Sequence, residues 1–141
     1  MADLAPTVAE IKPTGANAVI TSAIAGATLT AGQVVYIDPA DKKAKLASAA
    51  ALGTARAKGI TLHAALADQP VDIQTDGDLE WGTTTPPVTG VAYLLSGTAG
   101  GISPHLDATT PASGEYLTVI GVMAGTGVIR LCICASDHAT A

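Results

Sequence analysis

The stretch Val71–Trp81, with the sequence VDIQTDGDLEW, carries the clearest structural pattern in this chain. Its first five residues alternate between apolar or β-branched and polar side chains, as in a half-buried strand, and the Asp-Gly pair that follows is typical of hairpin turns. A three-residue loop over Asp76–Asp78 would place Ile73 opposite Trp81 and keep the charged residues together on the outer face. A two-residue loop would mix apolar and charged residues on one face. The pattern therefore predicts a β-hairpin that turns at residues 76–78.

Several other short runs have the composition of β-strands. The run QVVYI at Gln33–Ile37 is rich in β-branched and aromatic residues, and Asp38–Asp41 (DPAD) follows it as a turn with proline in its second position. Comparable runs lie at Val19–Ala23, Gly59–Leu66, Val91–Leu95, Tyr116–Met123 and Gly127–Cys134, and Thr83–Gly90 is a Pro-rich loop. About six to nine short strands at this spacing are typical of a barrel or sandwich. The sequence therefore predicts an all-β fold.

One stretch, Leu46–Lys58 (LASAAALGTARAK), has helical character. Alanine is the best helix former, and Ser48 is placed to cap the first turn. Gly53 inside the stretch limits it to one or two turns, and Gly59 is placed to end it and to open the next strand. We expect one short helix.

The first twenty residues have prolines at positions 6 and 13 and no helical period. Proline fixes φ and favours extended geometry in the residue before it. We therefore expect an extended N-terminal arm over residues 1–20, with a short strand at Thr7–Ile11, and a single β-rich domain over residues 21–141. Because Val8 and Ile11 are apolar, the arm is expected to dock on its own or on another subunit; the alternative is a frayed terminus.

The composition excludes several classes of protein. The chain has 141 residues, a net charge of −5, 48% hydrophobic residues and 13% charged residues. Disordered chains have low hydrophobicity and high charge, and proteins that bind nucleic-acid phosphates cluster Lys and Arg, so neither class fits. The uncharged stretches are broken by Gly, Pro and Thr, and the start (MADLAPTVAE) has no basic region followed by an apolar run. We expect synthesis in the cytoplasm and no nucleic-acid or membrane partner.

The surface is expected to be poor in charge. The 7 basic and 12 acidic residues, spread over a folded surface of roughly 6,700 Å², give about one charge per 350 Å². That is sparse for a soluble protein, so either Thr, Ser and backbone groups keep a monomer soluble or other chains cover part of the surface. The residues that we expect at such an interface are Pro6, Val8 and Ile11 of the arm and Trp81, for which the other interpretation is a place in the core.

Acidic residues are concentrated at Asp68, Asp72, Asp76, Asp78 and Glu80. Calcium loops place oxygen ligands at alternate positions around a glycine bend, and Asp72, Asp76 and Gly77 match the first, fifth and sixth positions of that pattern. However, Gln74 occupies the third position, Thr83 stands where the bidentate glutamate belongs, and no helices flank the segment. We therefore expect the acids to form the surface and turn of a hairpin rather than a cation site.

The cysteines and histidines show no catalytic or metal-binding pattern. Cys132 and Cys134 are two apart on a predicted strand, so their side chains share one face and make a poor disulfide. We expect two free thiols that are buried as small hydrophobic residues, with His138 as the only further metal ligand nearby. His63 and His105 fit no zinc or catalytic spacing. We expect no enzyme activity, no catalytic residue, no cofactor and no metal.

Two further clusters have simple interpretations. Ser96–Gly101 (SGTAGG) is glycine-rich, but it lies between strands and lacks the lysine and helix of a phosphate-binding loop. Lys42, Lys43 and Lys45 form a small basic cluster, which is either the solvated shoulder of a hairpin or a contact with an acidic partner surface.

A larger pattern appears when short strings are taken in order along the chain. They are TAGQVVY within Ala25–Ala47, KGITL and VDIQTDG within Lys58–Gly77, SGTAGGI within Ala92–Pro104 and VIGV within Tyr116–Ile133. In this order they resemble the small capsid decoration, or cement, proteins of tailed bacteriophages, over residues 25–133.

The resemblance implies a structural virion protein without catalytic residues. Proteins of this family typically sit on the outside of the phage head, often as trimers at three-fold and quasi-three-fold positions, and brace the shell against the pressure of the DNA inside. It implies that this chain is a homotrimer on the outer capsid surface, with the major capsid protein as its partner. The alternative is a receptor- or glycan-binding head or tail appendage, which should expose an aromatic patch, whereas this chain has one Trp, three Tyr and no Phe.

Overall fold

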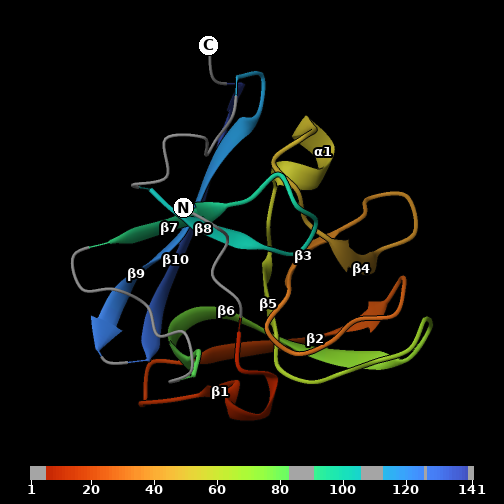
Figure 1. Cartoon of the computed structure of the whole chain (residues 1–141). Helices are drawn as coiled ribbons and strands as arrows, with labels where there is room; N and C mark the ends of the chain where they lie inside the picture. The colour runs from red at the N-terminus through yellow and green to blue at the C-terminus, as the bar shows by residue number, and fades with distance from the viewer. Residues whose placement is uncertain (1–5, 83–90, 106–112, 126, 140–141) are drawn as a thin grey trace.

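The computed structural model has the all-β fold that the sequence predicts, and it describes residues 6–82, 91–105, 113–125 and 127–139. The predicted loop Thr83–Gly90 lies outside these residues. The strands, shown in Figure 1, are β1 (Lys12–Pro13), β2 (Val19–Ala25), β3 (Val34–Ile37), β4 (Lys43–Leu46), β5 (Gly59–Thr61), β6 (Pro70–Glu80), β7 (Ala92–Leu95), β8 (Ile102–Pro104), β9 (Tyr116–Gly125) and β10 (Val128–Ala139). Two short helical turns, η1 (Val8–Glu10) and α1 (Leu52–Ala55), accompany them.

Five of the strands close into a small barrel. They pair in the order β2-β4-β3-β5-β6, and β6 pairs back onto β2, which completes the ring. All of these pairings are antiparallel except that of β2 with β4. Each of the five strands therefore has a neighbour on both sides over at least part of its length, although β4 covers only Ile24 and Ala25 of β2.

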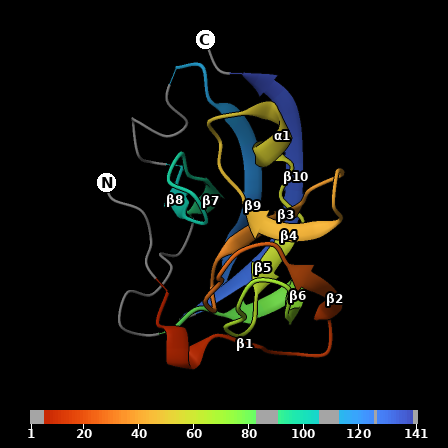
Figure 2. The ribbon, with the colours of Figure 1, turned by 90° about the vertical axis from the view of Figure 1, so that its right-hand side faces the viewer.

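The remaining strands form an open sheet that shares β6 with the barrel. Its order is β6-β10-β9-β7-β8, and β1 pairs with β6 on the other side. The first part of β6 pairs with β2 and β5, whereas its last residues pair with β1 and β10. In Figure 2, β9 and β10 rise from the barrel region towards α1. One long strand thus joins the two halves of the fold.

The hairpin predicted at Asp76–Asp78 is wrong, because β6 runs through these residues as one strand. Ile73 and Leu79, which lie on either side of the Asp-Gly pair and six residues apart, are both fully buried, so every second residue is buried before and after the pair. A continuous strand and a three-residue hairpin both satisfy this pattern. Gly77 has a φ of 86° and lies against the backbone of the segment that precedes β2. The chain therefore bends at Gly77 instead of reversing. The side-chain amide of buried Gln74 donates hydrogen bonds across the bend to the carbonyls of residues 76 and 78 (3.1 and 2.8 Å).

Two hydrophobic clusters share the wall of the barrel. The interior of the barrel contains Ala25, Leu29, Val35, Ala44, Ala65, Val71 and Ile73. The main core fills the space between the outside of β3 and β5 and the open sheet, with Trp81, Tyr93, Ile120, Ile129 and Leu131 among its members. Val34 and Val35 are neighbours in β3 but belong to different clusters, because successive strand residues face opposite sides.

The N-terminal arm, as far as the structure describes it, lies on its own domain. Thr7 N–H donates to the Trp81 carbonyl (3.1 Å), and Lys12 pairs with Glu80 in β1. From Thr7 to Lys12 the arm advances five positions, whereas its partners Trp81 and Glu80 are consecutive residues. Residues 8–11 must therefore loop out. This explains why η1 replaces the strand that was predicted at Thr7–Ile11, and why β1 is only two residues long.

The predicted helix is present as the single turn α1, and it ends before Gly59. Ser48 does not cap it: its hydroxyl accepts the Ala50 N–H (3.2 Å) and donates to the Gly97 carbonyl (2.9 Å), which ties this loop to the β7–β8 turn. Gly59 opens β5 as predicted, where a Cβ would collide with the Gln74 backbone on β6. The strand predicted to reach Leu66 ends at Thr61 instead.

Candidate interaction surfaces

Large hydrophobic side chains remain exposed at several places on the described surface. Their exposed fractions run from 37% to 59%, and they are Val8, Val19, Ile20, Ile24, Leu52, Leu66 and Val122. Three of them lie on β2, most of whose residues are exposed. Scattered single hydrophobic residues are normal on protein surfaces, so only a contiguous group of them indicates a binding surface.

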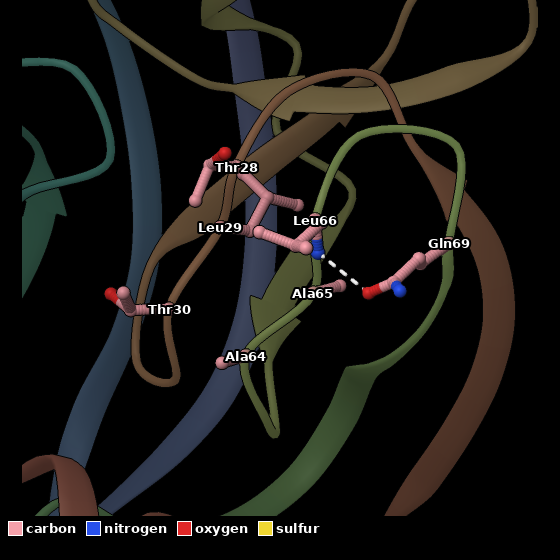
Figure 3. A pocket seen from close by; sticks show the side chains of 7 residues that line it. All are labelled: Thr28, Leu29, Thr30, Ala64, Ala65, Leu66 and Gln69. Atoms are coloured by element: carbon pink, nitrogen blue, oxygen red, sulfur yellow. Dashed lines mark hydrogen bonds between the residues drawn. The ribbon is translucent and has the colours of Figure 1, made fainter.

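Leu66, one of these exposed residues, lines a hollow of about 240 Å³ at the end of the barrel. Figure 3 shows its lining: Thr28, Leu29, Thr30, Ala64, Ala65, Leu66 and Gln69. The two loops that carry these residues are held together by a backbone bridge between Leu29 and Ala65, with hydrogen bonds of 2.8 and 3.0 Å in both directions. The Gln69 carbonyl oxygen Oε1 accepts the Leu66 N–H (2.9 Å) and fixes the second loop.

We call the exposed part of this region the barrel-end surface; it consists of Ile24, Thr28, Thr30, Ala64, Leu66 and Gln69. Ile24 belongs to it because its partner on β6, Pro70, follows Gln69 directly. None of the six residues is charged. Leu66, at 59% exposure, is the most exposed large hydrophobic residue of the described chain. The surface is therefore apolar, uncharged and mounted on a closed barrel.

Ion pairs border the barrel-end surface and take up most of the predicted basic cluster. Lys43 pairs with Asp68, and Lys45 pairs with Asp38 (2.7 Å) and Asp41 (3.1 Å). The hydrogen bond from Lys45 lowers the pKa of Asp38, and the same two carboxylates raise the pKa of Lys45. Two of the three lysines thus form ion pairs within the chain, with carboxylates of the β3–β4 hairpin and of the neighbouring loop. This agrees with the interpretation of the cluster as part of a hairpin.

The four predicted interface residues occupy different environments. Trp81 is 1% exposed and Ile11 is 7% exposed, and both belong to the main core. Pro6 is half-buried against Gly32, a glycine whose φ of 82° suits this close approach. Val8 is 53% exposed on η1. Of the four, only Val8 has most of its side chain exposed on the surface of the chain.

The structure brings a serine, a histidine and an aspartate together on the barrel wall, but not in catalytic order. The Ser22 hydroxyl donates to the Asp72 carboxylate (2.7 Å) rather than to the imidazole. His63 Nε2 accepts the backbone N–H of Asp72 (3.1 Å), which places the ring proton on Nδ1, within 2.9 Å of the Ala64 carbonyl. Both ring nitrogens are therefore occupied by backbone groups. The imidazole does not contact the hydroxyl, so the three groups do not form the nucleophile–histidine–aspartate series of a hydrolase. The cluster instead joins β2, β6 and the loop after β5.

The acidic residues of β6 point to separate partners. Asp78 accepts two hydrogen bonds from Arg130, from Nε (2.7 Å) and Nη2 (3.2 Å), and this pairing lowers the pKa of Asp78. Glu80 lies 3.4 Å from Lys12. Asp76 instead accepts the N–H of Gly77 at the bend. Among the described residues, no three potential metal ligands converge.

The prediction that Cys132 and Cys134 are buried is wrong, because both thiols are free and exposed. Their predicted common face is correct, but the alternation of β10 puts Ile129 and Leu131 inward, so the cysteines share the outer face with Arg130. The two remaining histidines, His105 and His138, are in different places. His105 Nδ1 accepts the N–H of Ala92 (2.9 Å) beside a second small hollow on the open sheet, and His138 is exposed near the end of β10.

Sequence reasoning did not find the barrel-end surface. The sequence predicts a strand that ends at Leu66, and its only signal for this surface is the Ala-rich composition of the two loops, which equally suits a buried segment. Comparison of the sequence with models of protein families gives no match, and comparison with curated proteins gives none. Neither helical turn of the described chain has the length and apolar character needed to cross a membrane.

Proposed function

We propose that this chain is a structural protein of a tailed-phage virion, which binds the outer surface of the assembled capsid as a homotrimer at three-fold and quasi-three-fold positions and stabilises the shell. Its partners are the major capsid protein and two further copies of itself. It is made in the host cytoplasm and functions without a cofactor, a metal or a catalytic residue.

The strings that resemble decoration proteins support this proposal through the framework that they build. KGITL contains Gly59 and the fully buried Thr61, VDIQTDG contains the bend at Gly77, and SGTAGGI forms the turn between β7 and β8. Each string lies where the backbone is crowded or bends sharply. The resemblance thus involves residues on which the fold depends rather than a run of common surface residues.

The observation that carries the proposal is the uncharged, apolar barrel-end surface on a chain of net charge −5. We assign this surface to the contact with the shell. Leu66 and Ile24 supply exposed apolar area there, and hydrophobic burial contributes about 25 cal/mol for each Å² removed from water. The closed barrel holds the two loops in place, so little conformational entropy is lost on binding.

Stabilisation would follow from mass action. A protein that binds the assembled shell but not the dissociated one stabilises the shell by about 2.7 kcal/mol per site at a free concentration of 100 times the dissociation constant. Three linked copies bind together, because attachment of the first raises the effective concentration of the others at the same lattice site. Modest contacts per copy are then sufficient.

The alternative, a receptor- or glycan-binding appendage, is less well supported by the structure. Sugar- and receptor-binding surfaces use exposed aromatic rings as platforms. Here Trp81 and Tyr93 are each 1% exposed, and Tyr36 and Tyr116 are half-buried against the main core. These four residues are all the aromatic residues of the chain.

The test is a heat-resistance assay on expanded phage heads that lack this protein. Added protein should raise the temperature at which the heads lose their DNA, and Leu66→Asp should abolish most of that gain. Leu52→Asp is the matched control, because Leu52 is also an exposed leucine (37%) but lies on α1, away from the barrel end. No gain with the wild-type protein would refute the function. An equal loss with both variants would refute the assigned surface alone.

A further inference from the structure

One edge of β2 lacks a partner strand along most of its length. On one side β2 pairs with β6 from Val19 to Ile24, whereas on the other side β4 pairs only with Ile24 and Ala25. No backbone hydrogen bond joins residues 20–23 to the β3–β4 hairpin loop at residues 38–42, and all of these residues belong to the described chain. Figure 2 shows β2 at the margin of the ribbon, next to β6. Residues 20–23 therefore form a sheet edge that no described strand covers.

This edge is regular. The pairing of β2 with β6 keeps one register from Ile20 to Ile24, and its only shift lies before Ile20. Both backbone groups of Asp72 bond the loop after β5: the N–H donates to the His63 ring (3.1 Å), and the carbonyl accepts a backbone N–H (2.9 Å). Ser22 lies opposite Asp72, so it directs its own N–H and C=O away from β6, and by alternation Ile20 does the same. The edge thus presents four backbone groups, two from each residue.

The edge also lacks the features that usually protect one. Natural edge strands carry lysines, prolines or inward-pointing charges that prevent pairing with another strand. Residues 19–23 have the sequence VITSA, which contains no charged residue and no proline. The first three are β-branched, as is typical of strands, and Ile20 is 48% exposed. The segment is therefore suited to pairing with a further strand.

We propose that residues 20–22 of β2 pair antiparallel with the same residues of a second copy of this chain, across a two-fold axis. An edge that pairs with itself supplies its own complementary hydrogen-bonding groups. The pairing also covers part of the exposed Ile20 side chain. Three residues per strand make a weak contact, which becomes populated where copies are concentrated.

The register follows from the two residues that carry the free groups. In an antiparallel pair, a residue that directs its N–H and C=O to the partner strand exchanges both bonds with the residue opposite. A two-fold axis through Thr21 places Ile20 of each copy opposite Ser22 of the other, so all of these groups are bonded. An axis through Ser22 would place Ile20 opposite Ile24, whose outer side β4 occupies. An axis through Ile20 would require Ala18, which precedes β2 and its register shift.

Charges near the two ends of the edge favour a second copy as the partner. Asp76 is exposed and lies opposite Val19, at the start of β2. Lys42 lies near the other end, directly before the residue of β4 that pairs with Ile24, and it is the one lysine of the basic cluster that has no ion pair with the described chain. In an antiparallel pair the start of one strand meets the end of the other. Lys42 of each copy therefore approaches Asp76 of the other, and the charges are complementary.

The contact is distinct from the proposed function and does not rest on it. It has two-fold symmetry, whereas the proposed trimer has three-fold symmetry, and it uses residues 20–22 rather than the barrel-end surface. Purified protein without capsids is sufficient to test it. A failure here therefore leaves the heat-resistance assay of the phage heads unaffected.

The experiment is oxidative cross-linking of the purified full chain, with Cys132→Ser and Cys134→Ser as the background, followed by non-reducing electrophoresis. Diamide, an azo compound, takes up one hydrogen from each of two thiols and leaves them joined as a disulfide. Thr21→Cys should form covalent dimers, because opposite Cα atoms of such a pair lie about 4.5 Å apart, within the range that a disulfide spans. Ile20→Cys and Ser22→Cys should each form them at least tenfold more slowly, because each thiol lies about 8 Å from its own copy, two residues along and one strand across.

A mixture of the two slow variants tests the register directly. Ile20→Cys and Ser22→Cys place their thiols opposite each other, with Cα atoms about 5.5 Å apart, so the mixture should form dimers at least tenfold faster than either variant alone. Fluorescence of the buried Trp81 confirms that each variant is folded. Equal rates for the three single-cysteine variants would indicate random collision and would overturn the proposal, as would a mixture no faster than its components.

An exchange of charges tests the choice of partner. In the Thr21→Cys chain, Asp76→Lys should slow cross-linking, because it brings two lysines together across the contact. Adding Lys42→Glu should restore the rate by pairing the opposite charges in the reverse order. A rate that Asp76→Lys leaves unchanged, or that the second substitution fails to restore, would contradict the proposed arrangement of the two copies.

Discussion

Substitution of Gly77 tests whether β6 bends, as described above, or turns back as a hairpin. In both arrangements a positive φ is expected at this residue, so alanine alone discriminates poorly. The difference lies in the surroundings. In the structure a Cβ on Gly77 would meet the backbone of Asn17 and Ala18, which precede β2 and cannot move without shifting that strand. A hairpin turn would point the same Cβ into solvent.

The magnitudes can be separated with a second glycine. Gly114 has nearly the same φ (85° against 86°) but has no atom within 4 Å of a Cβ placed on it. Gly114→Ala therefore measures the cost of the left-handed conformation alone, about 1–2 kcal/mol. Gly77→Ala adds the collision with the backbone, which at the usual cost of overpacking is about 1–3 kcal/mol more.

Asparagine sharpens the comparison, because it tolerates a positive φ far better than alanine does. Gly114→Asn should be nearly neutral, within about 0.5 kcal/mol, a normal value for an exposed substitution. Gly77→Asn should still lose about 1–3 kcal/mol, because the collision remains. The assay is urea unfolding followed by the fluorescence of the single, buried Trp81. Equal stability losses for the two asparagine variants would refute the bend and favour the hairpin.

Three further predictions concern separate parts of the fold. The Arg130 guanidinium holds the pKa of Asp78 below its ordinary value, so this pair stabilises the fold above about pH 4, and its contribution is lost as the pH falls further. In acid-unfolding curves, Arg130→Gln should therefore lose less unfolding free energy than the wild type between about pH 5 and pH 2. Leu29→Ala removes a side chain that is 1% exposed inside the barrel and should cost about 2–4 kcal/mol in urea unfolding, whereas Leu66→Ala, 59% exposed, should cost less than about 0.5 kcal/mol. The fully buried Thr61 hydroxyl bonds backbone groups of the loop after β2, so Thr61→Val should lower the unfolding free energy by about 1–3 kcal/mol, measured in the same way.

Much of the fold can be predicted from the sequence, because strand composition and period-2 alternation report burial directly. The runs at Val19–Ala23, Gln33–Ile37 and Tyr116–Met123 appear as β2, β3 and β9 with ends shifted by a few residues. The Asp-Gly pair is the main failure. Alternation around it keeps the same parity in a bent strand and in a three-residue hairpin, so the local pattern cannot separate them. Only the packing of the segment before β2 against Gly77 selects the bend.

The candidate surfaces were less predictable, since exposure depends on which elements pack together. Cys132 and Cys134 have the composition of buried strand residues, but the inward face of β10 is taken by Ile129 and Leu131. Leu66 lies in an Ala-rich segment that has the composition of a strand end. It is exposed because the residue before it, Ala65, is bridged to Leu29 at the end of the barrel. Neither the exposure of the two cysteines nor that of Leu66 can be predicted from the residues next to them in the sequence.

The most direct test of the proposed function is cryo-electron microscopy of expanded heads before and after addition of the purified chain. The proposal predicts new density on the outer surface at three-fold and quasi-three-fold positions, saturating at three copies per position, with the barrel-end surface facing the shell. Heads that show no added density at saturating protein, or density only at the tail or vertices, would contradict it.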